Sequence, residues 1–196
     1  MVRLTNNEKK ILLILFKDFS NYLNANSISK KVGISRIGSM KILKKLEKEE
    51  LLLKKQIGKS IVYRLNLQKD YTKHLIVFLL SDEANNFKRW LNEFKELFAE
   101  ERIVMLYGST IRDYSKARDI DIMIIREKGD SEEIHRIIKE RQKILPKKIH
   151  LIDLTPKEFL KNIEQKQSAI IDIIKNAIIL YGQNKYVELI KDVTSF

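Results

Sequence analysis

The stretch that decides the fold begins with Ile103-Val-Met-Leu-Tyr-Gly-Ser109 and continues, after nine residues, with Asp119-Ile-Asp-Ile-Met-Ile-Ile125. Each half contains a short apolar run of the kind that forms a buried strand. Side chains two residues apart in a strand point to the same face, so Asp119 and Asp121 are expected to project together. Adjacent carboxylates repel each other unless a cation lies between them, and hard divalent cations prefer oxygen ligands.

The Gly108-Ser109 step joins the first strand to the loop. A Gly-Ser turn that leads into a helix presents backbone N–H groups and a hydroxyl to an anion. The Gly-Ser turn can bind a phosphate and the two aspartates a metal ion. Together they predict a site for phosphoryl or nucleotidyl transfer. The alternative is a solvated strand entry with two charges beside a loop. Taken alone, the two aspartates would favour that alternative, but the turn and both strands together favour the site.

These residues resemble the signature of the DNA-polymerase-β-like nucleotidyltransferases, especially their minimal branch, and the resemblance covers about residues 87–190. It implies that Asp119 and Asp121 are the catalytic residues and bind a divalent metal, Mg²⁺ or Mn²⁺. It also implies binding of a nucleoside triphosphate, with Gly and Ser at the β- and γ-phosphates and a basic residue nearby. The implied nucleotide-binding residues are Gly108, Ser109 and Arg112.

In this family a third carboxylate on the next strand commonly completes the metal site. The run Lys148-Ile-His-Leu-Ile-Asp-Leu154 predicts that strand, and its register puts His150 at the expected position. Asp153 lies three residues further on, and residues i and i+3 of a strand point to opposite faces. His150 as a neutral metal ligand, Asp153 at the strand end, and a weakened or lost second metal site therefore stand as alternatives. No third metal-binding carboxylate is evident, so catalysis itself stays open.

Positive charge is concentrated in the first third of the chain. Of the formal net charge of +12, residues 1–70 account for +10, with 16 Lys and Arg against 6 Asp and Glu. This asymmetry is typical of a nucleic-acid-binding module. The chain has no cysteine, which excludes disulfides and thiolate metal sites. No apolar run approaches the roughly 18 residues of a membrane span, so a cytoplasmic protein without a membrane partner is expected.

The first third also has a recognisable order of elements. Apolar spacing predicts a first helix behind Asn6 or Asn7, a second from Ser27 to Val32 that Gly33 closes, and a third that Ser35 caps and that ends near Glu49. Residues 51–63 then predict a β-hairpin around Ile57-Gly-Lys-Ser60. Helix, helix–turn–helix and hairpin over residues 5–66 resemble a winged helix–turn–helix.

In winged helix–turn–helix proteins the second helix of the pair enters the DNA major groove. The resemblance therefore implies binding of double-stranded DNA through the third helix and the hairpin, with lysines on phosphates and Arg36 or Ser39 at base edges. A winged helix used only for protein contacts, with solvated lysines, is the alternative. The expected DNA-binding residues are Ser35, Arg36, Ser39, Lys41, Lys44, Lys45, Lys54, Lys55, Lys59 and Arg64.

Helices are predicted through most of the remaining chain. Residues 67–98 are expected to be helical with one break, restarting at Ser81. A helix from Ser131 to Ile144 and another that Thr155 caps are expected next. A last helix is predicted from Ile170 to Tyr181, as in the closing helix of small nucleotidyltransferases.

The predicted fold class is α+β or α/β, with an N-terminal winged helix–turn–helix at residues 1–70. A helical linker and candidate dimer surface follow at 71–86, and a nucleotidyltransferase-like domain with a short mixed sheet flanked by helices at 87–196. The predicted function is transfer of a nucleoside monophosphate to a hydroxyl of nucleic acid, protein or a small molecule. The alternatives are a winged-helix transcriptional regulator or antitoxin that binds nucleotide without efficient catalysis, and a plain DNA binder. A homodimer is expected, and the antitoxin reading adds a protein partner.

Overall fold

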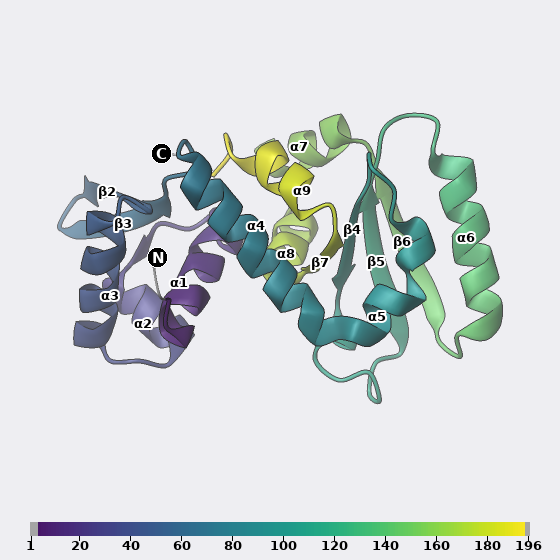
Figure 1. Ribbon diagram of the computed structural model, residues 1–196, viewed down its shortest axis with the longest axis horizontal. Helices are drawn as coiled ribbons and strands as arrows, with labels where there is room; N and C mark the ends of the chain where they lie inside the picture. Colours follow the sequence, from purple (N-terminus) through teal and green to yellow (C-terminus); the bar gives the residue numbers. More distant parts are fainter. Residues whose placement is uncertain (1–3, 195–196) are drawn as a thin grey trace. The chain divides into compact units, whose positions relative to one another are not determined.

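The computed structural model of the protein describes residues 4–194 (Figure 1). The chain divides into two compact units. The first unit runs to Leu79 and includes the C-terminal segment from Ile190, and the second is Leu80–Leu189. The outer ends of the predicted domains, residues 1–3 and 195–196, lie outside the described residues. Among the helices of the described part, none combines the length and apolarity that crossing a membrane requires.

The first unit has the element order predicted for a winged helix–turn–helix. Its three strands form an antiparallel sheet in the order β1-β3-β2. Gly58 and Lys59 alone separate the two long strands, which is the two-residue hairpin that the sequence predicted. The elements are α1 (Asn6–Lys17), β1 (Leu23–Asn24), α2 (Ala25–Val32), α3 (Arg36–Lys48), β2 (Leu52–Ile57) and β3 (Ser60–Leu65).

Local side-chain caps explain where these helices begin. Thr5 caps α1 in a capping box, one residue before the predicted pair of asparagines. Asn24 caps α2, so Ser27 lies inside the helix, where its hydroxyl oxygen accepts a hydrogen bond from the Asn24 backbone N–H (2.9 Å). Gly33 ends α2 in the left-handed region, and Ser35 caps α3 with a bond from the Gly38 N–H, both as predicted.

The predicted helix break at Ser81 is wrong. Helix α4 (Asp70–Ala84) continues past it, and the break comes at a 3₁₀ turn, Asn85–Phe87, before α5 (Lys88–Glu93). The side-chain amide of Asn86 donates hydrogen bonds to the carbonyls of Asp82 (3.2 Å) and Glu83 (3.3 Å). These bonds satisfy acceptors that the end of a helix leaves open, so the asparagine marks the boundary.

The second unit is built around a mixed four-stranded sheet in the order β6-β5-β4-β7. β4 pairs antiparallel with β5 and β7, whereas β5 and β6 are parallel. Figure 1 shows α6 on one side of this sheet and α7 to α9 on the other, the predicted short mixed sheet flanked by helices. The strands are β4 (Ile103–Tyr107), β5 (Asp119–Ile125), β6 (Lys148–Leu154) and β7 (Ile178–Tyr181). The helices are α6 (Ser131–Ile144), α7 (Pro156–Glu164), α8 (Ser168–Asn176) and α9 (Gln183–Ile190).

Alternation along β5 separates its core from its polar positions. Ile120, Ile122 and Ile124 are fully buried in a cluster that includes Trp90 and Ile134. The intervening positions point to the opposite face, which begins with the two aspartates. Burial of the isoleucines fixes which face of β5 packs against the core, and the two carboxylates therefore lie on the opposite face.

The predicted helix from Ile170 to Tyr181 is wrong in its second half. α8 ends at Asn176, Ala177 adopts an extended conformation (ψ 148°), and Ile178–Tyr181 forms strand β7 against β4. A short apolar run cannot be assigned to helix or strand by periodicity alone. The unpaired edge of β4 decides the outcome, because it supplies main-chain hydrogen-bond partners to the run.

Candidate metal and nucleotide site

Asp119 and Asp121 lie on one face at the start of β5, as the alternation predicted. Both are partly buried, with side chains 31% and 18% exposed. Burial raises the pKa of Asp121, and the adjacent charge of Asp119 raises it further, against a lowering contribution from His150. The pair is therefore electrostatically strained, which is the condition under which a bound cation is most stabilising.

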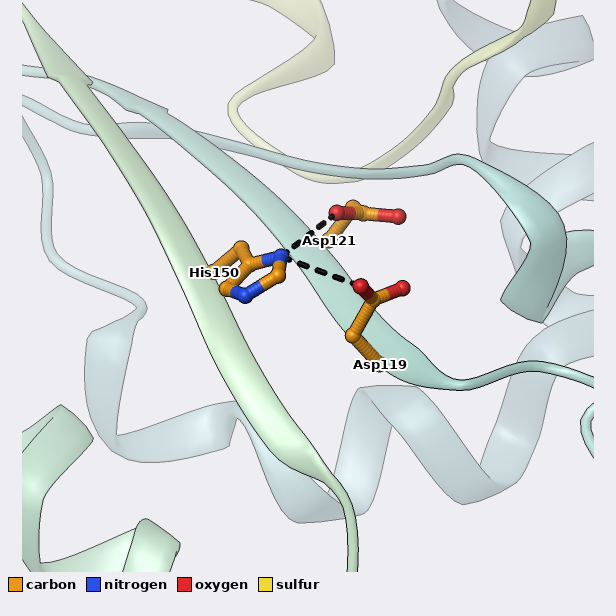
Figure 2. A group of neighbouring side chains, drawn as sticks. All are labelled: Asp119, Asp121 and His150. Carbon is orange, nitrogen blue, oxygen red and sulfur yellow. Dashed lines mark ion pairs between the residues drawn. The ribbon is translucent and has the colours of Figure 1, made fainter.

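His150 completes a cluster with these carboxylates. In the parallel pairing of β5 and β6 it is the direct partner of Asp121, so its side chain projects from the same face. Its Nδ1 atom lies 3.2 Å from Asp119 Oδ2 and 3.6 Å from Asp121 Oδ1, and Figure 2 shows the ring turned toward both acids. Ligand atoms from all three residues lie within 4.8 Å of one another.

Asp153 is not part of this cluster. It pairs with Ile124, whose side chain faces the opposite side of the sheet. Arg126 holds it with two hydrogen bonds, Nε to Oδ1 (2.8 Å) and Nη2 to Oδ2 (2.9 Å), and the Ser131 hydroxyl donates a third (2.9 Å). Burial alone would raise the pKa of Asp153, but these bonds outweigh it and lower the pKa. Asp153 thus forms an ion pair with Arg126, and His150 is the β6 residue that lies beside the two aspartates.

Gly108 allows the two motifs to meet. Its backbone has φ 77° and ψ −154°, a region essentially restricted to glycine. A Cβ atom at this position would lie 2.1 Å from Asp121 Oδ2, far inside van der Waals contact. The absence of a side chain therefore permits both the turn and the approach of the Asp121 carboxylate to it.

The Gly-Ser step leads into a short 3₁₀ turn, Ser109–Ile111, and not into an α-helix. The Thr110 hydroxyl, which is buried, donates a hydrogen bond to the carbonyl of Asp119 (2.8 Å). This bond ties the turn to the first residue of β5. Sequence reasoning did not single out Thr110, since its only local signal is a hydroxyl next to the Gly-Ser step.

A pocket of about 280 Å³ opens beside the turn. Arg112 lines it together with Gly108, so the predicted phosphate contact borders a real cavity. Burial, followed by the charges of Asp121 and Asp119, raises the pKa of Tyr107 to about 12, so this phenol stays protonated. Helix α8 supplies the far wall, which the sequence did not reveal because it lies some sixty residues away. The lining residues are Tyr107, Gly108, Ile111, Arg112, Asp172, Ile173 and Asn176.

Lys147 fixes the loop that joins the turn to β5. Its ammonium group donates hydrogen bonds to the carbonyls of Tyr114 and Ala117 and lies 4.2 Å from the centroid of the Tyr114 ring. The loop is thereby closed against the residue that precedes β6.

The same segment carries the sequence match. Residues 92–186 fit the family model described as Polymerase beta, Nucleotidyltransferase. This nucleotidyltransferase match includes the Gly-Ser turn, both aspartates of β5 and His150. Among curated proteins, none matches the chain significantly.

Several solved structures are similar to the chain. The zinc-responsive MarR family member ZitR of Lactococcus lactis is 22% identical, with a TM-score of 0.34 over 49% of this chain and 62% of that one. A point mutant of ZitR in complex with DNA is 20% identical, with a TM-score of 0.37 over 50% and 66%. The adhesin competence repressor AdcR of Streptococcus pyogenes is 16% identical, with a TM-score of 0.36 over 73% and 81%. The chain spans less than two thirds of the first two proteins, and these values concern fold alone.

In the first unit, basic side chains of α3 and of the hairpin meet around a pocket of about 230 Å³. Arg36, Lys44 and Lys59 contribute to its lining, and Lys41 and Lys55 are also exposed. Ser35 is exposed, but its hydroxyl already accepts the capping bond at the start of α3.

Four other residues of the expected DNA-binding set are engaged within the protein. Lys45 Nζ lies 2.7 Å from Glu8 Oε1, and Lys54 Nζ lies 2.7 Å from Glu47 Oε1. The remaining two, Ser39 and Arg64, contradict the prediction more directly.

The prediction that Ser39 reaches base edges is wrong, because Ser39 is fully buried on the stripe of α3 that also carries Leu43 and Leu46. Arg64 is equally unsuited to phosphate contact. Its Nη1 donates a hydrogen bond to the Thr194 carbonyl (2.9 Å), and its guanidinium lies 5.4 Å from the centroid of the Tyr22 ring.

Proposed function

We propose that the second unit transfers a nucleoside monophosphate from a nucleoside triphosphate to a hydroxyl acceptor. Asp119 and Asp121 are the proposed ligands of a divalent cation, Mg²⁺ or Mn²⁺. Gly108, Ser109 and Arg112 are the proposed contacts of the triphosphate. The observation that carries the proposal is the close approach of the Asp121 carboxylate to the side-chain-free Gly108, which sets acidic ligands directly beside the turn.

The residues present fit a divalent cation. Two carboxylates and an imidazole converge on one point, and the carboxylates repel each other without a positive charge between them. When bound, the cation would neutralise charge that develops on the triphosphate. The chain's own contribution is to hold the acids on a paired strand, to keep the Gly108 main chain beside Asp121, and to add the positive charge of Arg112 at the pocket.

Transfer of radiolabel from each of the four nucleoside triphosphates tests the proposal. DNA ends, the protein itself and small-molecule hydroxyls are offered as acceptors, and the labelled fraction identifies the acceptor class. Asp119→Asn and Asp121→Asn should each reduce labelling by at least about 100-fold. Glu132→Gln removes an exposed carboxylate of α6 and is the matched control, which should label normally. Undiminished labelling by both aspartate variants would refute the proposal.

We also infer that the first unit binds double-stranded DNA. The charge of +10 over residues 1–70 and the exposed basic side chains around the α3 pocket support this. Lys41→Glu with Lys44→Glu should abolish binding measured by fluorescence anisotropy, whereas Lys48→Glu at the end of α3 should change it little. Affinity should fall steeply between 50 and 200 mM salt, by roughly 10³-fold or more if six phosphates are contacted. Binding that does not depend on salt would contradict this interface. A loss of affinity in Lys48→Glu as large as that of the Lys41→Glu, Lys44→Glu double variant would also contradict it.

We infer that residues 1–70 and 87–196 are the functional domains, although the compact units divide at Leu79 and the segment from Ile190 packs with the first unit, and that residues 71–86 form the surface of a homodimer. Tyr71 and Phe78 support the dimer, because they are 55% and 57% exposed and lie seven residues apart on α4. Sedimentation of the wild type and of Tyr71→Lys with Phe78→Lys tests it. A monomeric wild type would refute the dimer.

A second function is favoured by His150. Its Nδ1 atom lies 3.2 and 3.6 Å from the two carboxylates, and a ring that keeps this place between them would leave a nucleotide-binding regulator or antitoxin without efficient catalysis. Calorimetric binding of nucleoside triphosphate with no release of pyrophosphate for any acceptor would establish this alternative in place of transfer.

A further inference from the structure

The third position of the proposed metal site carries nitrogen instead of oxygen. We propose that His150 is a direct metal ligand and that it makes the site select a first-row transition ion, such as Mn²⁺, Co²⁺ or Zn²⁺, over Mg²⁺. This inference rests on the metal site of the proposed function and adds the class of ion that occupies it.

The spacing of the donor atoms fits a shared ion. Ligands bound about 2.0–2.2 Å from one small divalent cation lie roughly 3–3.5 Å apart from each other. Nδ1 of His150 is 3.2 Å from the nearer oxygen of Asp119 and 3.6 Å from that of Asp121, so a cation between them requires only small side-chain rotations. Figure 2 shows the three groups converging from neighbouring strands.

The backbone holds this arrangement in place. β5 and β6 are paired over seven consecutive residues, from Asp119 with Lys148 to Ile125 with Leu154. Within that ladder His150 stands directly opposite Asp121, and its side chain is 45% exposed. All three side chains keep part of their surface open to solvent, at 31%, 18% and 45% exposed for Asp119, Asp121 and His150.

The donor set discriminates between ions. Mg²⁺ prefers oxygen ligands, gives up water reluctantly and is seldom bound through imidazole. Imidazole suits the later first-row ions, whose affinity for nitrogen rises along the series from Mn²⁺ to Cu²⁺. A neutral imidazole in place of a carboxylate also removes one negative charge from the site. That loss weakens the purely electrostatic attraction on which Mg²⁺ depends, while the nitrogen strengthens binding of a transition ion.

The competing explanation predicts the opposite change in metal affinity when His150 is removed. If His150 acted only as an internal cation between the aspartates, its removal would free the acids and tighten metal binding. If it is a ligand, its removal weakens binding. The sign of the effect of His150→Ala therefore decides between the two roles.

Binding of Mn²⁺ alone, followed by the loss of its free-ion EPR signal, provides the test. His150→Ala should weaken Mn²⁺ binding by about tenfold or more. His150→Asp should keep Mn²⁺ binding but lower the ratio of Co²⁺ to Mg²⁺ affinity by at least about tenfold. His135→Ala removes the histidine of α6, which bonds to Ser131, and as the matched control it should leave both quantities unchanged. Thermal melting confirms that each variant is folded.

Pulsed EPR of the bound Mn²⁺ supplies a signature that a structural role would not give. A ¹⁴N coupling should be present in the wild type and in the His135 variant and absent in His150→Asp. Bound Mn²⁺ without ¹⁴N coupling, or equal or tighter binding by His150→Ala, would overturn the inference while leaving the metal site intact. Absence of Mn²⁺ binding, or binding that survives Asp119→Asn and Asp121→Asn together, would refute the metal site of the proposed function as well.

Discussion

Replacing Gly108 by alanine should damage both the stability and the metal site of the second unit. The new Cβ would lie 2.1 Å from Asp121 Oδ2 and 2.9 Å from its Cγ, so the carboxylate must move. The backbone conformation at φ 77° and ψ −154° adds about 1–3 kcal/mol of strain for any residue other than glycine. Overpacking of this kind costs another 1–3 kcal/mol or so. The two effects sum to about 2–6 kcal/mol, a large fraction of the stability of an ordinary domain.

Urea unfolding of Gly108→Ala, read beside Mn²⁺ affinity of the folded protein, measures both consequences. Gly182→Ala is the matched control, because its φ is 79° and its Cβ would lie 2.4 Å from the Arg102 carbonyl at the opposite end of β4. The control should lose comparable stability but keep its Mn²⁺ affinity, whereas Gly108→Ala should lose both. A Gly108→Ala protein with wild-type stability and wild-type Mn²⁺ binding would show that the reasoning about this contact is mistaken.

Three further predictions concern stability. Asp153→Asn should lower the free energy of unfolding by about 2–4 kcal/mol at pH 7, because it breaks the ion pair with Arg126. Since folding lowers the pKa of Asp153, this difference should be full above the ordinary value of 3.8 and vanish as the pH falls through the lower folded value; urea titrations from pH 7 to 2 that show a constant difference would contradict it. Arg102→Met should cost about 2–4 kcal/mol, because a guanidinium only 2% exposed loses its bonds to two carboxylates; an unchanged melting temperature would refute this role. Thr155→Ala should cost about 1 kcal/mol through loss of the α7 cap, and Thr155→Ser should restore most of it.

The parts of the fold that the sequence predicted correctly are those set by local rules. The strand Lys148–Leu154 and the helix Ser131–Ile144 have the predicted limits, because alternation and helical spacing are properties of a single segment. The capping box at Thr155 and Glu158 is likewise present as predicted. The position of His150 beside the motif aspartates came from the resemblance to the nucleotidyltransferase family, and the pairing of β5 with β6 agrees with it.

The errors arose where distant segments decide the structure. Ile178–Tyr181 is a strand because it pairs with the free edge of β4, and no local sequence pattern indicates that edge. Ser39 is buried because α3 turns that stripe inward, although the residue is polar. The wall of the pocket formed by Asp172 and Asn176 depends on α8 folding back toward the Gly-Ser turn, so only the tertiary structure could bring it to the site.

The parallel ladder between β5 and β6 also determines which changes the site can tolerate during evolution. The partnership of Asp121 and His150 depends on hydrogen-bond pairing and not on the length of the crossover between the strands. Insertions in that crossover can accumulate without altering the ligand set, whereas deletion of one residue of β6 ahead of His150 would bring Leu151 opposite Asp121. A one-base substitution from a histidine to an aspartate codon would convert the mixed donor set to an all-carboxylate one, so the choice of ion can change in a single mutational step.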